Sequence, residues 1–275
     1  MAAPQRHVSP EDVGILAIQC AFPASYVDQQ DLERHDGVEG KYTVGLGQEE
    51  LGFCGDREDA VSLALTALSK LMAVHGIRPE DVGRLEVGSE SGGDASKSVK
   101  SHLMALFAGS GSTDIEGCDC LHACYAATSA VQSAANWVES RAWDGRLAIV
   151  VATDVATYAP GPARPSSGAG AAAILLGPNA PLALERGLSA SAWTPAYDFC
   201  RPTGAGPFPI VDGRQSVELY LSTLSTCYER YCAKFEAAWG RAFSLDDAAA
   251  AVFHAPYHRL AAKAAARLLY LDLCR

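Results

Sequence analysis

The chain has 275 residues, of which 49% are hydrophobic and 20% are charged, and its formal net charge is −10. Such a composition is typical of a globular protein with enough apolar side chains for a sizeable core. The acidic balance argues against nucleic-acid binding as a main role, because phosphate recognition needs clustered lysine and arginine. No apolar run has the ~18–20 residues of a membrane span.

The amino-terminal segment and the cysteines favour a reducing compartment. The stretch "MAAPQRHVSPEDVG" lacks the apolar core of a secretory signal and carries acidic residues early. Nine cysteines are an odd number without a regular framework, which argues against a disulfide scaffold. We therefore expect a cytoplasmic protein that has neither a membrane nor a nucleic acid as partner.

The expected elements alternate between strands and helices. Residues 13–22 form an apolar run typical of a strand buried on both faces. Residues 56–76 predict a helix with acidic residues in its first turn and Gly76 as its carboxyl-terminal cap. Further strands are expected at 83–91, 114–123, 145–156, 171–178 and 180–193, the last two being neighbours, and further helices at 96–111 and 124–140. The alternation predicts an α/β fold with a mainly parallel sheet.

A second unit is expected to open with a strong helix at 216–240. Residues 246–273 then predict one more strand and one more helix, and no further strand-forming sequence follows. No fixed-period repeat or low-complexity tract is visible.

Three cysteines lie within seven positions, in and just before the stretch "DCLHACYAATSA" (119–130). A metal cluster would need CxxC pairs, and Cys118, Cys120 and Cys124 are two and four residues apart, so no metal site is expected. Cys118 and Cys120 share one face of a short strand, where core packing is the simple interpretation.

Cys124 lies at the predicted junction between a strand and a helix. Unpaired backbone N–H groups and the helix dipole at such a junction favour an anion and can lower the pKa of a thiol. The same N–H groups could hold a developing oxyanion. From these arguments alone, Cys124 is either a nucleophile or another buried cysteine.

Seven motifs in a fixed order resemble hydroxymethylglutaryl-CoA synthase of the eukaryotic cytosolic type. They are "DGVEGKYTVGLGQ", "GFCGDRED", "GRLEVGSES", "TDIEGCDCLHACYAATSAV", "NWVESRAWDGR", "FPIVDG" and "VFHAPYHRL". The resemblance covers nearly all of residues 12–272. It implies a thiolase-like fold, with residues 12–185 as a complete first αβ half and residues 186–275 as a partial second half. It also implies condensation of acetyl-CoA with acetoacetyl-CoA and water to 3-hydroxy-3-methylglutaryl-CoA in the mevalonate pathway, by a homodimer.

The resemblance assigns roles to particular residues. Cys124 matches the family's nucleophile in "ACYGGT", Glu90 its general acid/base after "EVG", and His254 the histidine of its "HSPY" motif. The implied residues for binding substrate and CoA are Ser166, Ser216, Arg259 and Lys263. No cofactor is implied, since the CoA thioesters are substrates.

These residue types suit the chemistry. A thiolate can accept the acetyl group, which divides one acyl transfer into two easier steps. A carboxyl group such as Glu90 can then remove a proton from the acetyl methyl, with a pKa raised by burial, and an imidazole such as His254 can polarise a carbonyl or protonate an alkoxide. Arg259 and Lys263 lie four residues apart on one helical face, as a pair of phosphate ligands would.

The sequence departs from the family pattern in four respects. Ala126 and Ala127 replace a glycine pair, His122 replaces an asparagine, and Pro162 stands where a substrate-binding asparagine is expected. The chain also ends after "LLYLDLCR", so most of the second half of the family's sequence is absent.

Two alternatives therefore stay open. The first is an inactive fragment that binds CoA or the intact enzyme, and the second is a ketoacyl synthase of the same fold. Glu90 within "GSES" and the stretch "GKYTVGLGQ" favour the synthase over the ketoacyl synthase. An incomplete gene model would also explain the short chain.

Overall fold

A computed structural model describes residues 10–94, 96–202, 204 and 206–275. The chain forms two compact units. The first contains the described residues up to Tyr26, with Gly52–Ala156 and Gly168–Leu184. The second contains Val27–Leu51, Thr157–Ser167 and Glu185–Arg275, so neither unit is continuous in sequence. The two halves that the family resemblance implies, residues 12–185 and 186–275, stay a prediction.

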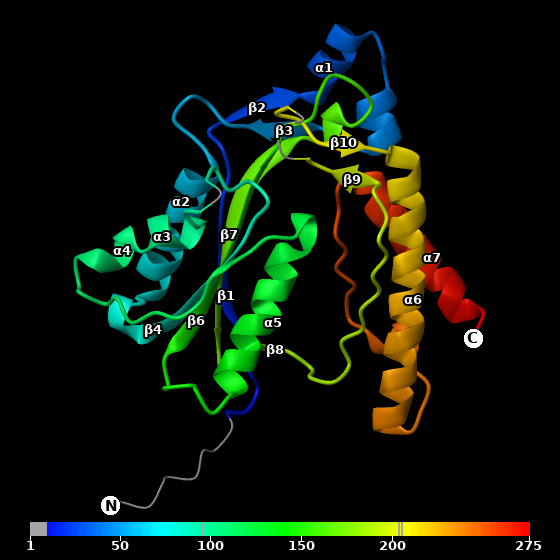
Figure 1. The fold of residues 1–275 in the computed structure, drawn as a ribbon. Helices are drawn as coiled ribbons and strands as arrows, with labels where there is room; N and C mark the ends of the chain where they lie inside the picture. Colours follow the sequence, from blue (N-terminus) through cyan, green and yellow to red (C-terminus); the bar gives the residue numbers. More distant parts are fainter. Residues whose placement is uncertain (1–9, 95, 203, 205) are drawn as a thin grey trace, which may run out of the picture. The chain divides into compact units, whose positions relative to one another are not determined.

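The first unit is built on a six-stranded sheet in the order β5-β4-β6-β7-β1-β8 (Figure 1). Its strands are β1 (Gly14–Ala21), β4 (Val82–Gly88), β5 (Asp119–Cys120), β6 (Leu147–Ala156), β7 (Gly168–Gly177) and β8 (Leu182–Ala183). Strand β4 is parallel to β5 and β6, whereas β6–β7, β1–β7 and β1–β8 are antiparallel pairs.

The prediction of a mainly parallel sheet is therefore wrong, and the sheet is mixed. A parallel pair needs a crossover connection, usually a helix. Between β6 and β7 the chain forms only the short 3₁₀ turn η4 (Arg164–Ser166), and β7 returns antiparallel to β6. The expected neighbours at 171–178 and 180–193 are also separated, because β8 pairs with β1 instead of β7.

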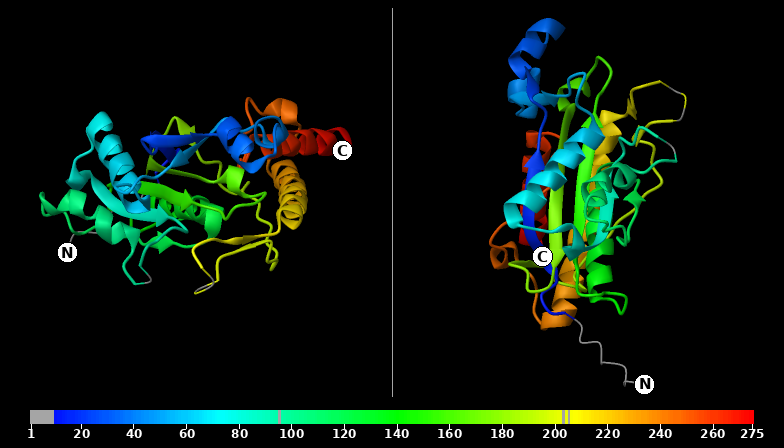
Figure 2. Two further views of the ribbon diagram at one scale, coloured as in Figure 1. Left: turned by 90° about the horizontal axis from the view of Figure 1, so that it is seen from above. Right: turned by 90° about the vertical axis from the view of Figure 1, so that its left-hand side faces the viewer.

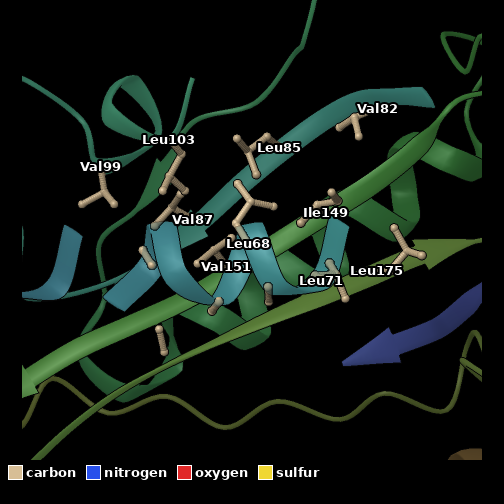
Figure 3. Packing of buried hydrophobic residues seen from close by; sticks show 14 of the residues in the cluster. Leu68, Leu71, Val82, Leu85, Val87, Val99, Leu103, Ile149, Val151 and Leu175 are labelled. Atoms are coloured by element: carbon tan, nitrogen blue, oxygen red, sulfur yellow. The ribbon is translucent and has the colours of Figure 1, made fainter. Parts of the chain in front are cut away.

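Helices cover both faces of this sheet. Helix α2 (Ala60–His75) packs on β7, β1 and β6, and α5 (Ala126–Glu139) packs on β4 and β6 (Figures 1 and 2). Successive residues of β6 point to opposite faces, as expected for a strand. Ile149 and Val151 join the core beneath α2, and Ala148 and Val150 join the core beneath α5. Figure 3 shows the first core, where Leu68 and Leu71 of α2 meet side chains of β4 and β6.

The helix boundaries confirm some predictions and correct others. Gly76 caps α2 in the left-handed conformation, as predicted. No acidic residue lies in the first turn of α2, because Asp59 is instead its amino-terminal cap and forms a capping box with Ser62. The single helix expected at 96–111 is divided at Met104 into α3 (Val99–Leu103) and α4 (Ala105–Ala108).

The strand expected at 13–22 is confirmed as β1, but its burial on both faces is not. Ile18 is 46% exposed and Phe22, just beyond the strand, is 74% exposed. An antiparallel strand can leave one face to solvent, which a parallel strand between helices cannot.

The second unit consists mainly of helices. These are α1 (Gln29–Asp36), the π-helical turn η1 (Lys41–Leu46), α6 (Gly213–Trp239), the 3₁₀ turn η5 (Leu245–Asp247) and α7 (His258–Leu273). A small antiparallel pair joins β9 (Phe199–Cys200) and β10 (Ile210–Val211). A further strand pair, β2 (Ser25–Asp28) with β3 (Glu50–Phe53), has residues that belong to both units. Within the described chain, α6 packs against α7 around Tyr228, Cys232 and Leu268 (Figure 2).

The helices expected at 216–240 and near the end of the chain are confirmed as α6 and α7. The strand expected between them is wrong, because residues 248–257 form neither helix nor strand. Its apolar sequence is compatible with a strand, but no neighbouring strand pairs with it. No helix of the described residues is long and apolar enough to cross a membrane.

Candidate functional site

The first part of the candidate site lies at the carboxyl ends of the three parallel strands. Glu90 comes two residues after β4, Asp154 is near the end of β6, and Cys124 comes four residues after β5. The crevice outside the carboxyl ends of parallel strands is the usual place for a ligand in α/β proteins. The fold therefore brings Glu90 and Cys124 to the same end of the sheet.

Asp154 holds the segment that carries Glu90. One of its carboxylate oxygens accepts hydrogen bonds from the Glu90 backbone N–H (2.8 Å) and from the hydroxyls of Ser91 (2.9 Å) and Ser89 (3.2 Å). The Ser91 hydroxyl in turn accepts from the N–H of Val155 at 2.9 Å. Desolvation raises the pKa of Asp154 in spite of these hydrogen bonds.

Cys124 lies in the 3₁₀ turn η3 (Ala123–Tyr125), which leads directly into α5. The carbonyl of His122 accepts hydrogen bonds from the N–H groups of Tyr125 (3.0 Å) and Ala126 (3.1 Å). Ala123 has a φ of +35°, which is unusual for a residue with a side chain. A strained residue next to the candidate nucleophile agrees with the clustering of backbone strain at functional sites.

Gly88 brings the end of β4 into contact with the start of α5. A Cβ atom at this position would lie 2.4 Å from the backbone nitrogen of Ala127 and 2.5 Å from its Cα. Only glycine permits this approach, because such distances are far below van der Waals contact. The same contact therefore fixes the spacing between Glu90, two residues after Gly88, and Cys124, three residues before Ala127.

The pKa of Cys124 differs from the prediction. A helix start was expected to lower it, whereas desolvation, followed by the charges of Glu90 and Asp154, raises the pKa of Cys124 to about 11. Desolvation of the sulfur is the main cause, and the two nearby carboxylates add to it by disfavouring the thiolate. Cys124 is exposed overall, so the desolvation reflects the crowded surroundings of the sulfur rather than complete enclosure.

The expectation of core packing is wrong for Cys118, which is exposed, whereas Cys120 is half-buried and packs against the core beneath α5. Strand β5 is two residues long and lies at the edge of the sheet, so it offers little cover. The backbone N–H of Cys118 donates to the buried carboxylate of Glu86 at 3.1 Å. Glu86 also accepts from Arg84 Nε (2.7 Å) and Ser133 Oγ (3.1 Å), which ties β4 to α5.

His254 belongs to the second unit, in the irregular segment 248–257. The hydroxyl of Tyr220, on α6, donates a hydrogen bond to the His254 carbonyl at 2.7 Å. The two rings lie 6.4 Å apart with a tilt of 36°. His254 is an exposed residue, yet local desolvation lowers the pKa of its imidazole, which favours the neutral form.

The candidate CoA ligands also lie in the second unit. Arg259, in the first turn of α7, donates from Nε to the carbonyl of Val44 at 3.2 Å. Lys263 is exposed one turn later, and Lys41 is exposed at the start of η1, the element that contains Val44. Ser216 is half-buried on α6. Arg259 and Lys263 on α7 and Lys41 on η1 are thus three exposed cations.

Ser166 lies in η4, where its hydroxyl donates to the carbonyl of Ala163 at 2.7 Å. Two contacts hold this turn against α1. The amide of the fully buried Gln29 donates to the carbonyl of Pro165 at 2.8 Å, and Arg164 forms an ion pair with Asp36.

The structure adds two residues that the sequence analysis missed. Asp154 ends a buried strand in "VVATDVA", and an acidic residue at that point is a usable signal once β6 is placed beside β4. Tyr220 lies within an amphipathic helix and carries no comparable signal. Glu90 and Cys124 belong to the first unit, and His254 belongs to the second.

Family models match residues 9–275 of the chain in two parts. The family model described as "Hydroxymethylglutaryl-coenzyme A synthase N terminal" matches residues 9–181, and the corresponding C-terminal model matches residues 182–275. The cytoplasmic hydroxymethylglutaryl-CoA synthase of Homo sapiens is 52% identical over 269 residues. This match covers 96% of the chain but 52% of the human protein, so the chain spans about half the length of such relatives.

Two solved structures resemble the whole described fold. MvaS in complex with 3-hydroxy-3-methylglutaryl coenzyme A has a TM-score of 0.90 and 37% identity, covering 96% of this chain and 64% of that one. An HMG-CoA synthase complexed with CoA has a TM-score of 0.82 and 26% identity, covering 94% and 63%. The predicted thiolase-like α/β fold is thereby confirmed. The chain belongs to the hydroxymethylglutaryl-CoA synthase family.

Proposed function

We propose that the protein condenses acetyl-CoA with acetoacetyl-CoA and water to give 3-hydroxy-3-methylglutaryl-CoA and CoA. The observation that carries this proposal is the meeting of Glu90 and Cys124 at the carboxyl end of β4 and β5, in a chain of this family. The activity as a whole is a proposal, because the chain spans about half the length of the curated relatives that it matches.

The first step is acetylation of Cys124. Its sulfur attacks the acetyl thioester carbonyl, the bond to CoA breaks, and CoA leaves as a thiol after taking up a proton. The raised pKa of Cys124 means that the thiol must lose its proton as the attack proceeds. Glu90 and Asp154 are the nearby carboxylates whose charges act on that thiol, and one of them can accept the proton.

The second step joins the two acyl groups. Glu90 removes a proton from the methyl of the acetyl–cysteine, and the resulting carbanion attacks the ketone carbon of acetoacetyl-CoA. His254 donates a proton to the alkoxide that forms, and water then hydrolyses the thioester to Cys124. Asp154 supports this step by holding the backbone N–H of Glu90 at 2.8 Å.

Arg259 and Lys263 provide the positive charge that CoA phosphates require against a net charge of −10, and Lys41 adds to it. Ser216 and Ser166 complete the proposed binding residues. Relatives crystallised with 3-hydroxy-3-methylglutaryl coenzyme A and with CoA support a CoA-thioester ligand. A homodimer that needs no cofactor is part of the proposal, and so is a cytoplasmic location, which the name of the human relative supports.

Labelled acetyl-CoA tests the proposal directly. The purified chain is incubated with [¹³C]acetyl-CoA, and the peptide that contains Cys124 is analysed by mass spectrometry. We expect an acetyl group on Cys124 that is absent from Cys124→Ala, and formation of 3-hydroxy-3-methylglutaryl-CoA once acetoacetyl-CoA is added. A folded chain that takes up no label at saturating acetyl-CoA contradicts the proposal, and CoA binding alone would then favour the inactive fragment.

A further inference from the structure

We infer that Tyr220 is a positioning residue for His254, acting through its hydrogen bond to the His254 backbone carbonyl. The effect of Tyr220 on catalysis rests on the proposed function, whereas its effect on the position of His254 does not. The contact lies within the second unit, at 2.7 Å between the Tyr220 hydroxyl and the carbonyl oxygen.

The segment that carries His254 needs an external support. Residues 248–257 form neither helix nor strand, so neither hydrogen-bonding pattern fixes their backbone. Phe253 packs partly against the core between α6 and α7 and anchors one side of His254. The Tyr220 hydroxyl, on a helix, supplies the hydrogen-bond donor that helix or strand pairing would otherwise give the His254 carbonyl. A backbone carbonyl needs such a partner.

Helix α6 is suited to hold this donor in place. Asp212 caps its first turn by accepting from the N–H of Gln215 at 3.0 Å, and Tyr220 lies two turns further on. Ser216 precedes Tyr220 by four residues and therefore lies on the same face of the helix. One helical face thus carries both a candidate substrate ligand and the support of the candidate acid.

The ring of Tyr220 adds to the effect of its hydroxyl. Its centroid lies 6.4 Å from that of the His254 imidazole, so the tyrosine contacts the segment through a hydrogen bond and borders the functional ring as well. Desolvation raises the pKa of Tyr220, so the hydroxyl stays protonated and remains a donor through the physiological range.

Tyr228 on the same helix gives a matched control. Its hydroxyl donates to Asp272 of α7, so Tyr228→Phe also removes one tyrosine hydrogen bond from the second unit. A general loosening of the unit would follow from either substitution. Only Tyr220→Phe should change the surroundings of His254.

The experiment uses ¹³C-histidine NMR on the full chain, with the His254 signal assigned by its loss in His254→Asn. In Tyr220→Phe we expect that signal to shift and broaden, and in Tyr228→Phe to stay at its wild-type position. The wild-type chain should also give a nuclear Overhauser contact between the Tyr220 ring and the His254 imidazole, which requires no variant. An unchanged His254 signal in folded Tyr220→Phe, or absence of that contact, overturns the inference.

Separate assays of the acetylation step and the condensation step distinguish a failure of this inference from a failure of the proposed function. If the chain condenses its substrates, Tyr220→Phe should acetylate Cys124 at the wild-type rate and condense at least roughly tenfold more slowly, since a small misplacement of a catalytic group is costly. If the wild-type chain is never acetylated, the proposed function fails, and the NMR result alone decides whether Tyr220 positions His254.

Discussion

Neutralising Glu90 should make Cys124 more reactive toward an alkylating agent. The charge of Glu90 is the largest cause, after desolvation, of the raised pKa of Cys124. Glu90→Gln keeps the shape of the side chain and the backbone N–H that donates to Asp154, and it removes the negative charge. The thiolate of Cys124 is then repelled by one carboxylate fewer, so the pKa of the thiol falls.

The size of the effect follows from the two pKa values. At pH 8 a thiol with a pKa of about 11 is roughly 0.1% ionised, and one with the ordinary value of 9.0 is roughly 9% ionised, a difference of about 100-fold. Desolvation is the leading cause of the raised pKa, so removing the charge of Glu90 should lower the pKa by less than half of the difference between these two pKa values. The fraction of thiolate then rises by under about tenfold. A less basic thiolate is also a weaker nucleophile, which leaves about a threefold gain in rate.

The assay measures alkylation by iodoacetamide at pH 8, peptide by peptide, with mass spectrometry. Exposed Cys20 in the same unit is the internal reference, and its rate should not change. Glu80→Gln removes an exposed carboxylate that pairs with Arg78 and should leave Cys124 unaffected. If Cys124 in Glu90→Gln reacts at the wild-type rate or more slowly, the assignment of its raised pKa to neighbouring charge is wrong.

Two predictions concern stability, measured by urea unfolding of the chain. Gly88→Ala should lower the free energy of unfolding by about 1–3 kcal/mol, because the new methyl group meets the backbone of α5, whereas Gly92→Ala, which has nothing within 4 Å, should change it little. Arg84→Ala should cost about 3–5 kcal/mol by removing the ion pair that Arg84 forms with the carboxylate of Glu86, which is 0% exposed. Removing the exposed ion pair with Arg78→Ala should have little effect, and equal losses for the two arginines would contradict the role given to burial.

The sequence predicts local features of the fold better than it predicts which strands pair with one another. The apolar run of β6 and the helix ended by Gly76 follow from hydrophobic periodicity and capping, which depend on neighbouring residues. The antiparallel return of β7 depends on the lack of a crossover helix, a property of a longer segment. Residues 248–257 have a strand-like composition, yet composition says nothing about whether a pairing strand is within reach.

The same distinction holds for the candidate site. Glu90 and Cys124 are candidates from the sequence alone, because each follows a recognisable strand and matches a motif. The pKa of Cys124 could not be predicted, because its main cause is desolvation of the sulfur in the folded chain, and Asp154, whose charge adds to it, comes from β6, 30 residues further along the chain. The role of Tyr220 could not be predicted either, since it needs the irregular path of the segment around His254.

The two carboxyl groups beside the Cys124 thiol bear differently on the two steps of the proposed reaction. Desolvation and then the charges of Glu90 and Asp154 raise the pKa of Cys124, so the resting thiol is neutral and its anion would add a further negative charge at this end of the sheet. Acetylation converts the neutral thiol into a neutral thioester, which can no longer ionise. In the second step Glu90 can therefore act as a base with no thiolate beside it. The acidic surroundings oppose the thiolate of the first step, and acetylation removes that ionisable group before the second step begins.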